Sequence, residues 1–86
     1  MNETQDNTRL AIAGIIVEDR ACAEKINALL HEAGEYIVAR TGMPYPKRNV
    51  NIITVILDAP ENVISNLSGK LGQLPGVSVR VTYSKR

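Results

Sequence analysis

The sequence predicts one α+β domain with the element order βαββαβ. Four short runs rich in Ile and Val are typical of strands. Two longer stretches carry apolar residues at helical spacing, and Gly and Pro separate the elements. A chain of 86 residues is long enough for one such domain. We place it at residues 9–86 and expect the polar residues 1–8 to be a disordered N-terminus.

The first strand is predicted at residues 10–17, LAIAGIIV. This run has no charge, and its eight residues are too short to span a membrane. A strand places alternate residues on opposite faces. Here one face carries Leu10, Ile12 and Ile16, and the other carries Ala11, Ala13, Ile15 and Val17. Because both faces are apolar, the strand belongs in the middle of a sheet with a layer on each side.

A helix is predicted after this strand. Asp19 is a good N-cap, which would start the helix near Arg20. Apolar residues then recur at the spacing of one helical face: Ala23, Ile26, Leu29, Leu30 and Ala33. Gly34 is expected to end the helix as its C′ residue.

The second and third strands are predicted at residues 36–41 and 50–58. Residues 42–49 contain two prolines and a glycine, which favours a loop between them. The third strand is apolar on both faces, with Ile53, Val55 and Leu57 on one and Val50, Ile52 and Ile56 on the other. It is therefore expected to be central, like the first.

The second helix and the fourth strand complete the order. Pro60 suits the first turn of a helix. The apolar stripe that follows comprises Val63, Ile64, Leu67, Leu71 and Leu74. Pro75 and Gly76 end the helix, and residues 77–83 alternate as a strand with one apolar face. We interpret Gly69 and Gly72, inside the helix, as positions of close packing against another helix or a partner chain.

This order is the split βαβ, or ferredoxin-like, arrangement. It is a four-stranded antiparallel sheet with strands one and three in the centre and two helices on one face. The other face keeps an apolar row from both central strands. Such a patch usually marks an interface, so we expect a homo-oligomer, either a dimer or a tetramer. A half-solvated face with small residues is the alternative.

Composition excludes several partners and sites. The net charge is +1 and the only aromatic residues are three tyrosines, which disfavours nucleic-acid and membrane surfaces as partners. Cys22 is the single cysteine, so no internal disulfide can form, as suits a cytoplasmic protein. Cys22 and His31 would point to opposite sides of the first helix. We therefore expect no metal site, no cofactor and no catalytic residues.

Two groups of residues are candidate binding sites. Glu18, Asp19 and Arg20 lie where the first strand meets the first helix, and free N–H groups at a helix start can hold a small ligand. Capping by Asp19 is the simpler explanation of this group. Arg40, Lys47 and Arg48 form a basic group around residues 40–48 that could contact phosphates. A solvated loop is the usual explanation of such charges.

Four segments resemble those of a known family. They are residues 67–79 (LSGKLGQLPGVSV), which are the most specific, with residues 16–20 (IVEDR), 26–31 (INALLH) and 40–44 (RTGMP). The chain resembles the small proteins described as proposed regulators of the iron-only hydrogenase system. The resemblance implies an ACT-like ligand-sensing domain, similar to the C-terminal domain of nickel-responsive repressors, with a role in transcriptional regulation. It does not carry over nickel binding, because this chain has one His and one Cys.

The resulting hypothesis is a non-enzymatic, oligomeric, ACT-like regulatory domain that senses a small-molecule effector or binds a protein partner. The DNA-binding ribbon of the nickel-responsive repressors is not found in this sequence, so we expect DNA to be reached through a partner chain. Two alternatives stay open. One is a small dimeric α+β-barrel enzyme, which needs a polar pocket on the open sheet face. The other is a nucleic-acid binder acting through residues 40–48.

Overall fold

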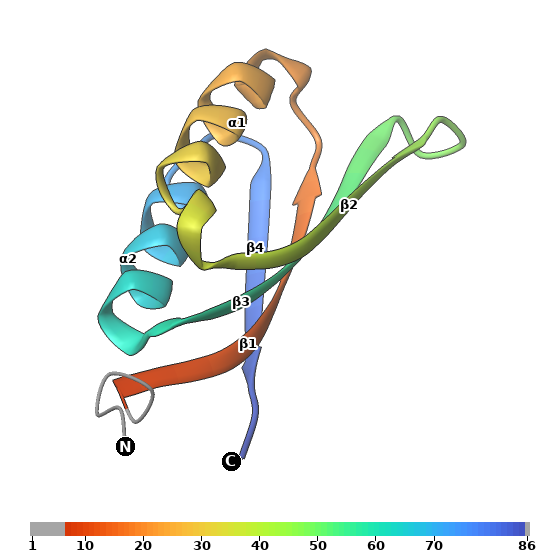
Figure 1. Cartoon of the computed structure of the whole chain (residues 1–86). Helices are drawn as coiled ribbons and strands as arrows, with labels where there is room; N and C mark the ends of the chain where they lie inside the picture. The colour runs from red at the N-terminus through yellow and green to blue at the C-terminus, as the bar shows by residue number, and fades with distance from the viewer. Residues whose placement is uncertain (1–6, 86) are drawn as a thin grey trace.

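The computed structural model describes residues 7–85 (Figure 1). Its elements, in chain order, are β1 (Thr8–Val17), the 3₁₀ helix η2 (Arg20–Cys22), α1 (Ala23–Glu32), the 3₁₀ helix η3 (Gly34–Tyr36), β2 (Ile37–Tyr45), β3 (Val50–Pro60), α2 (Glu61–Gly72) and β4 (Val77–Tyr83). Residues 1–6 of the predicted disordered terminus lie outside the described part. Thr8 is already in β1, so the first strand begins two residues earlier than predicted.

The strands form one antiparallel sheet in the order β2-β3-β1-β4. The central pair is β1 and β3, as the sequence predicts, and β2 and β4 are the edges. Both α-helices cover the same face of the sheet (Figure 1). The predicted α+β, ferredoxin-like βαββαβ fold is therefore confirmed. Within residues 7–85, neither helix has the length and apolarity that crossing a membrane requires.

The core lies between this face and the helices. Ile15 of β1 and Leu57 of β3 are completely buried there. The helices contribute the apolar stripes that their spacing predicts, with Ile26 and Leu30 from α1 and Ile64, Leu67 and Leu71 from α2. Burial of these side chains supplies most of the driving force for folding, at about 25 cal/mol per Å² of apolar surface.

The first helix differs from the prediction at both ends. The Oδ1 atom of Asp19 accepts a hydrogen bond from the Ala21 N–H at 2.9 Å, so Asp19 caps η2, and α1 begins only at Ala23. Gly34 is not a left-handed C′ residue; it begins η3. The Ala33 N–H bonds to Leu30 O, and the Tyr36 N–H to Ala33 O. These short-range bonds satisfy the helix end, which removes the need for a left-handed glycine.

The prediction of a loop over residues 42–49 is wrong for residues 42–45. Strand β2 continues to Tyr45, and only residues 46–49 form the turn to β3. Pro44 pairs opposite Asn51 inside this strand. Proline is tolerated there because β2 is an edge strand with a neighbour on one side only. The long β2–β3 hairpin projects beyond α1 (Figure 1).

The sheet face without helices is apolar. Ladder partners lie on the same face, and Ile12 pairs with Ile56 while Ile16 pairs with Ile52, which in turn pairs with Met43. We call this surface the open face; its large apolar residues are Leu10, Ile12, Ile16, Met43, Tyr45, Val50, Ile52 and Ile56. Ile12 is 48% exposed and Met43 is 53% exposed. The predicted uncovered apolar row is therefore present.

Candidate functional site

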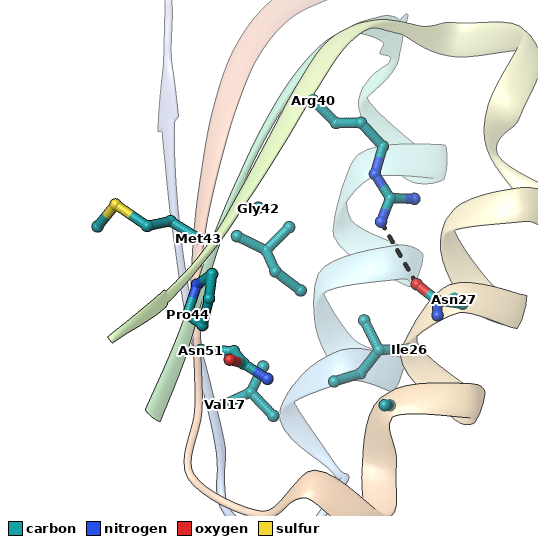
Figure 2. Close-up of a pocket in the computed structure, with 10 residues that line it drawn as sticks. Val17, Ile26, Asn27, Arg40, Gly42, Met43, Pro44 and Asn51 are labelled. Carbon is teal, nitrogen blue, oxygen red and sulfur yellow. Dashed lines mark hydrogen bonds between the residues drawn. The ribbon is translucent and has the colours of Figure 1, made fainter. Parts of the chain in front are cut away.

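A pocket lies on the helix side of the sheet, between α1 and the β2–β3 hairpin (Figure 2). Its volume is about 300 Å³. It is lined by Val17, Ala23, Ile26, Asn27, Arg40, Gly42, Met43, Pro44, Asn51 and Ile53. This volume is at the lower end of the range for small-molecule sites.

Residues of β2 alternate between the two faces of the sheet, and every second one lies on the helix side, next to this pocket. Arg40, Gly42 and Pro44 face α1, whereas the side chain of Met43 points away from the pocket toward the open face (Figure 2). A Cβ atom added at Gly42 would meet nothing within 4 Å. The missing side chain of Gly42 therefore leaves part of the space that forms the pocket.

Two Arg–Asn hydrogen bonds connect the hairpin to the helical layer. Arg40 of β2 donates through Nη2 to Oδ1 of Asn27 on α1 at 3.3 Å (Figure 2). Arg20 of η2 donates through Nη2 to Oδ1 of Asn49 in the hairpin turn at 3.4 Å. Both bonds are exposed, so each contributes little to stability. One connects the hairpin to α1 and the other connects it to η2.

The lining of the pocket is mostly apolar and carries one charge. Val17, Ile26 and Ile53 give it apolar walls, and Arg40 is the one charged residue among the lining residues. No carboxylate, imidazole, hydroxyl or thiol lines it, so it holds no acid–base pair or nucleophile. Within residues 7–85 no group of His, Cys, Asp and Glu side chains could hold a metal ion.

The predicted ligand residues flank the pocket without lining it. The Glu18 N–H bonds to Gly76 O at 2.7 Å, which joins the β1–η2 junction to the turn before β4. Asp19 serves as the cap of η2, the simpler of the two explanations. Arg20 reaches the hairpin turn through Asn49.

The three basic residues proposed as phosphate contacts lie in two parts of the hairpin. Arg40 lines the pocket and contacts α1. Lys47 and Arg48 lie in the exposed turn at residues 46–49 and do not line the pocket. Contact of these three residues with phosphates stays a prediction.

The cysteine and the histidine lie apart, as their spacing predicts. Cys22 is 4% exposed, and its thiol donates to Pro75 O at 3.2 Å. His31 is exposed in the last turn of α1. The interpretation of Gly69 and Gly72 as close-packing positions is wrong within this chain, because a Cβ atom at either would meet nothing within 4 Å.

Several pocket residues were missed at the level of sequence. Gly42, Pro44 and Asn51 were assigned to a loop or to no site, because two prolines and a glycine outweighed the strand pattern. Asn27 was assigned to no site. The available signal was the continuing alternation of small or polar residues at 40, 42 and 44 with larger ones at 43 and 45.

The comparison with solved structures finds similarity in sequence as well as in fold. The uncharacterized protein TM1266 from Thermotoga maritima is 42% identical, with a TM-score of 0.85, over 91% of this chain and 99% of that one. The search of curated proteins gave no match.

More distant structures share the fold alone. The C-terminal domain of the MgtC protein from Mycobacterium tuberculosis is 13% identical, with a TM-score of 0.71 over 94% of this chain and 93% of that one. The nitrogen regulatory PII-like protein CPII from Thiomonas intermedia K12, in its apo form, is 21% identical, with a TM-score of 0.58 over 88% and 89%.

The family comparison covers most of the described residues. The profile of the TM1266-like family matches residues 9–81, which run from β1 into β4. The segments that carried the resemblance all lie inside this match. The chain therefore belongs to the TM1266-like family, described as a proposed iron-only hydrogenase system regulator.

Proposed function

We propose that this chain is a non-enzymatic, cytoplasmic regulatory domain that assembles with itself through the open face and responds to a small ligand. The observation that carries the proposal is the apolar row on both central strands, on the sheet face without helices. Membership of a family described as regulators supports the regulatory part. The site chemistry supports the non-enzymatic part, since the pocket lining contains no nucleophile and no acid–base pair.

A second copy of the chain is the occupant that the open face fits best. Leu10, Ile12 and Ile16 are each close to half exposed, and monomers rarely leave contiguous apolar patches of this kind in water. The same face also carries Asp58, the partner of Leu10, and Arg80, the partner of Gly14. Within residues 7–85 neither of these charges forms an ion pair. A two-fold dimer would bring two identical faces together and offer each charge one of opposite sign.

Sedimentation velocity over a range of protein concentrations tests this assembly. We expect the unmodified chain to be a dimer or a tetramer and Ile12→Asp to be a folded monomer. Ala28→Asp, at an exposed position of α1, is the matched control and is expected to leave the oligomer unchanged. A chain that stays monomeric at the highest accessible concentration contradicts the proposal, as does an oligomer that Ile12→Asp leaves intact.

The transcriptional role is tested in cells that encode an iron-only hydrogenase. We propose that the domain acts there through a partner chain that binds DNA. Deleting the gene for this chain is expected to change the level of hydrogenase transcripts, and the unmodified gene is expected to restore it. Restoration by the Ile12→Asp variant as well would show that self-assembly is not part of the regulation. Unchanged transcripts would contradict the role itself.

A further inference from the structure

We propose that the pocket between α1 and the β2–β3 hairpin binds a small carboxylate with a branched apolar body, and that Arg40 pairs with the carboxylate. This inference rests on the ligand-sensing part of the proposed function and names the ligand class. It places the ligand under the hairpin, beside the β1–η2 junction rather than at Glu18, Asp19 and Arg20.

Arg40 supplies the charge that selects an anion. A guanidinium has five N–H donors, and within residues 7–85 the only hydrogen bond assigned to that of Arg40 goes to Oδ1 of Asn27. No carboxylate pairs with Arg40 anywhere in residues 7–85. Figure 2 shows its side chain extending across the pocket toward α1. Arginine pairs with carboxylates through two parallel hydrogen bonds, so a carboxylate matches its remaining donors.

The apolar lining residues favour an aliphatic body for the rest of the ligand. The aliphatic lining residues are Val17 and Ile26, which are almost fully buried and lie below Arg40 in Figure 2, and the half-buried Ile53. Burying a branched aliphatic group against them is favourable, by about 0.8 kcal/mol per buried CH₂. The amide groups of Asn27 and Asn51 offer additional donors at the polar side. Because Arg40 is the one cation in the lining, the pocket suits a ligand with a single negative charge. The second negative charge of a phosphate dianion would have no cationic side chain in the lining to pair with.

The probe we would use is 4-methylpentanoate, with its neutral amide, 4-methylpentanamide, as the matched control. Binding is followed by the methyl signals of Val17, Ile26 and Ile53 in carbon–proton NMR spectra. We expect these signals to shift and saturate with the acid. We expect the amide to bind about tenfold more weakly or worse, because it lacks the charge that strengthens the pair with Arg40.

Three variants locate the site. Arg40→Gln is expected to weaken binding of the acid about tenfold and to leave binding of the amide unchanged. Arg48→Gln removes a positive charge from the same hairpin outside the pocket, and it is expected to change neither. Gly42→Leu is expected to abolish binding by filling the space, and the strand should keep its fold because a Cβ there meets nothing within 4 Å.

Several results would overturn the inference. They are shifts that never saturate, equal binding of the acid and the amide, an unchanged affinity in a folded Gly42→Leu variant, and inorganic phosphate displacing the acid. The assembly proposal fails separately. A chain that self-associates but does not bind the acid overturns only this inference, and a monomer that binds the acid overturns only the assembly.

Discussion

Gly76 lies directly against Asp19, at the point where the turn between α2 and β4 meets the start of η2. A Cβ atom at Gly76 would be 2.9 Å from Cβ of Asp19 and 3.2 Å from its backbone nitrogen. The φ angle of Gly76 is +71°, in the region that favours glycine. Hydrogen bonds from the Glu18 N–H to Gly76 O and from the Cys22 thiol to Pro75 O join the same two segments.

The first prediction follows from this contact. Gly76→Ala is expected to lower the free energy of unfolding by about 1–3 kcal/mol, because the new methyl group meets backbone atoms and the left-handed conformation is strained. Urea unfolding followed by circular dichroism measures the change. Gly69→Ala is the control; it adds a methyl group into open space in a helix and is expected to stabilise by about 0.5–1 kcal/mol. A destabilised Gly69→Ala variant would instead indicate a partner packed on α2.

The second prediction separates the two faces of β1. Ile15 is completely buried and Ile12 is 48% exposed on the same strand. Ile15→Val is expected to lower the free energy of unfolding by about 1 kcal/mol at every protein concentration. Ile12→Val is expected to have an effect that grows with protein concentration, because in the proposed assembly a second copy covers its side chain. Equal and concentration-independent effects of both variants would contradict burial of the open face by a second copy.

The third prediction concerns Tyr36, which follows the end of α1. A hydrogen bond with Glu35 and the negative charge of that carboxylate raise the pKa of Tyr36 above its ordinary value of 10.0. Because the pKa of Tyr36 is higher in the folded chain than in the unfolded chain, this group stabilises the fold at a pH below its unfolded-state pKa. That contribution is lost as the pH rises through its folded-state pKa. We expect Glu35→Gln to lower the pKa of Tyr36, as measured on its ring carbons by NMR. An unchanged pKa would show that Glu35 is not the cause.

The fold was predictable because its strongest signals are periodic. The alternation of residues 10–17 and 77–83 and the stripe from Val63 to Leu74 each match the burial in the structure. The errors lie where tertiary context outweighs local preference. Pro44 is tolerated in a strand because β2 is an edge, a place that the predicted strand order already gave it, but the two prolines and the glycine of residues 42–49 outweighed the continuing alternation and the strand was ended four residues early.

The pocket could not be predicted from local pattern. Asn27 and Arg40 come from different elements, and their contact depends on how α1 lies over the hairpin. Arg40 was read with Lys47 and Arg48 because the three are close in sequence. In the structure the alternation of β2 turns Arg40 to the helix side, while the other two stay in the turn. The capping role of Asp19, by contrast, is a local property and was predictable.

The last prediction concerns the turn that positions the hairpin over the pocket. Asn49 has a φ angle of 57°, and it is the only non-glycine residue in the described part with a positive φ. Asparagine tolerates this conformation, and its Oδ1 atom also accepts the bond from Arg20. Asn49→Ala is expected to lower the free energy of unfolding by about 1 kcal/mol, because it keeps the strain and loses the polar side chain.

Asn49→Gly is the matched variant for that turn. It relieves the strain but also removes the acceptor, so its stability is expected to stay within about 0.5 kcal/mol of the unmodified chain. Both variants lose the contact between η2 and the hairpin. Hydrogen exchange at the amides of residues 41–45 is therefore expected to be faster in both, even where the stability of Asn49→Gly is unchanged. Unchanged exchange in the glycine variant would show that the Arg20–Asn49 bond does not hold the hairpin, which would leave Arg40 and Asn27 as its connection to the helical layer.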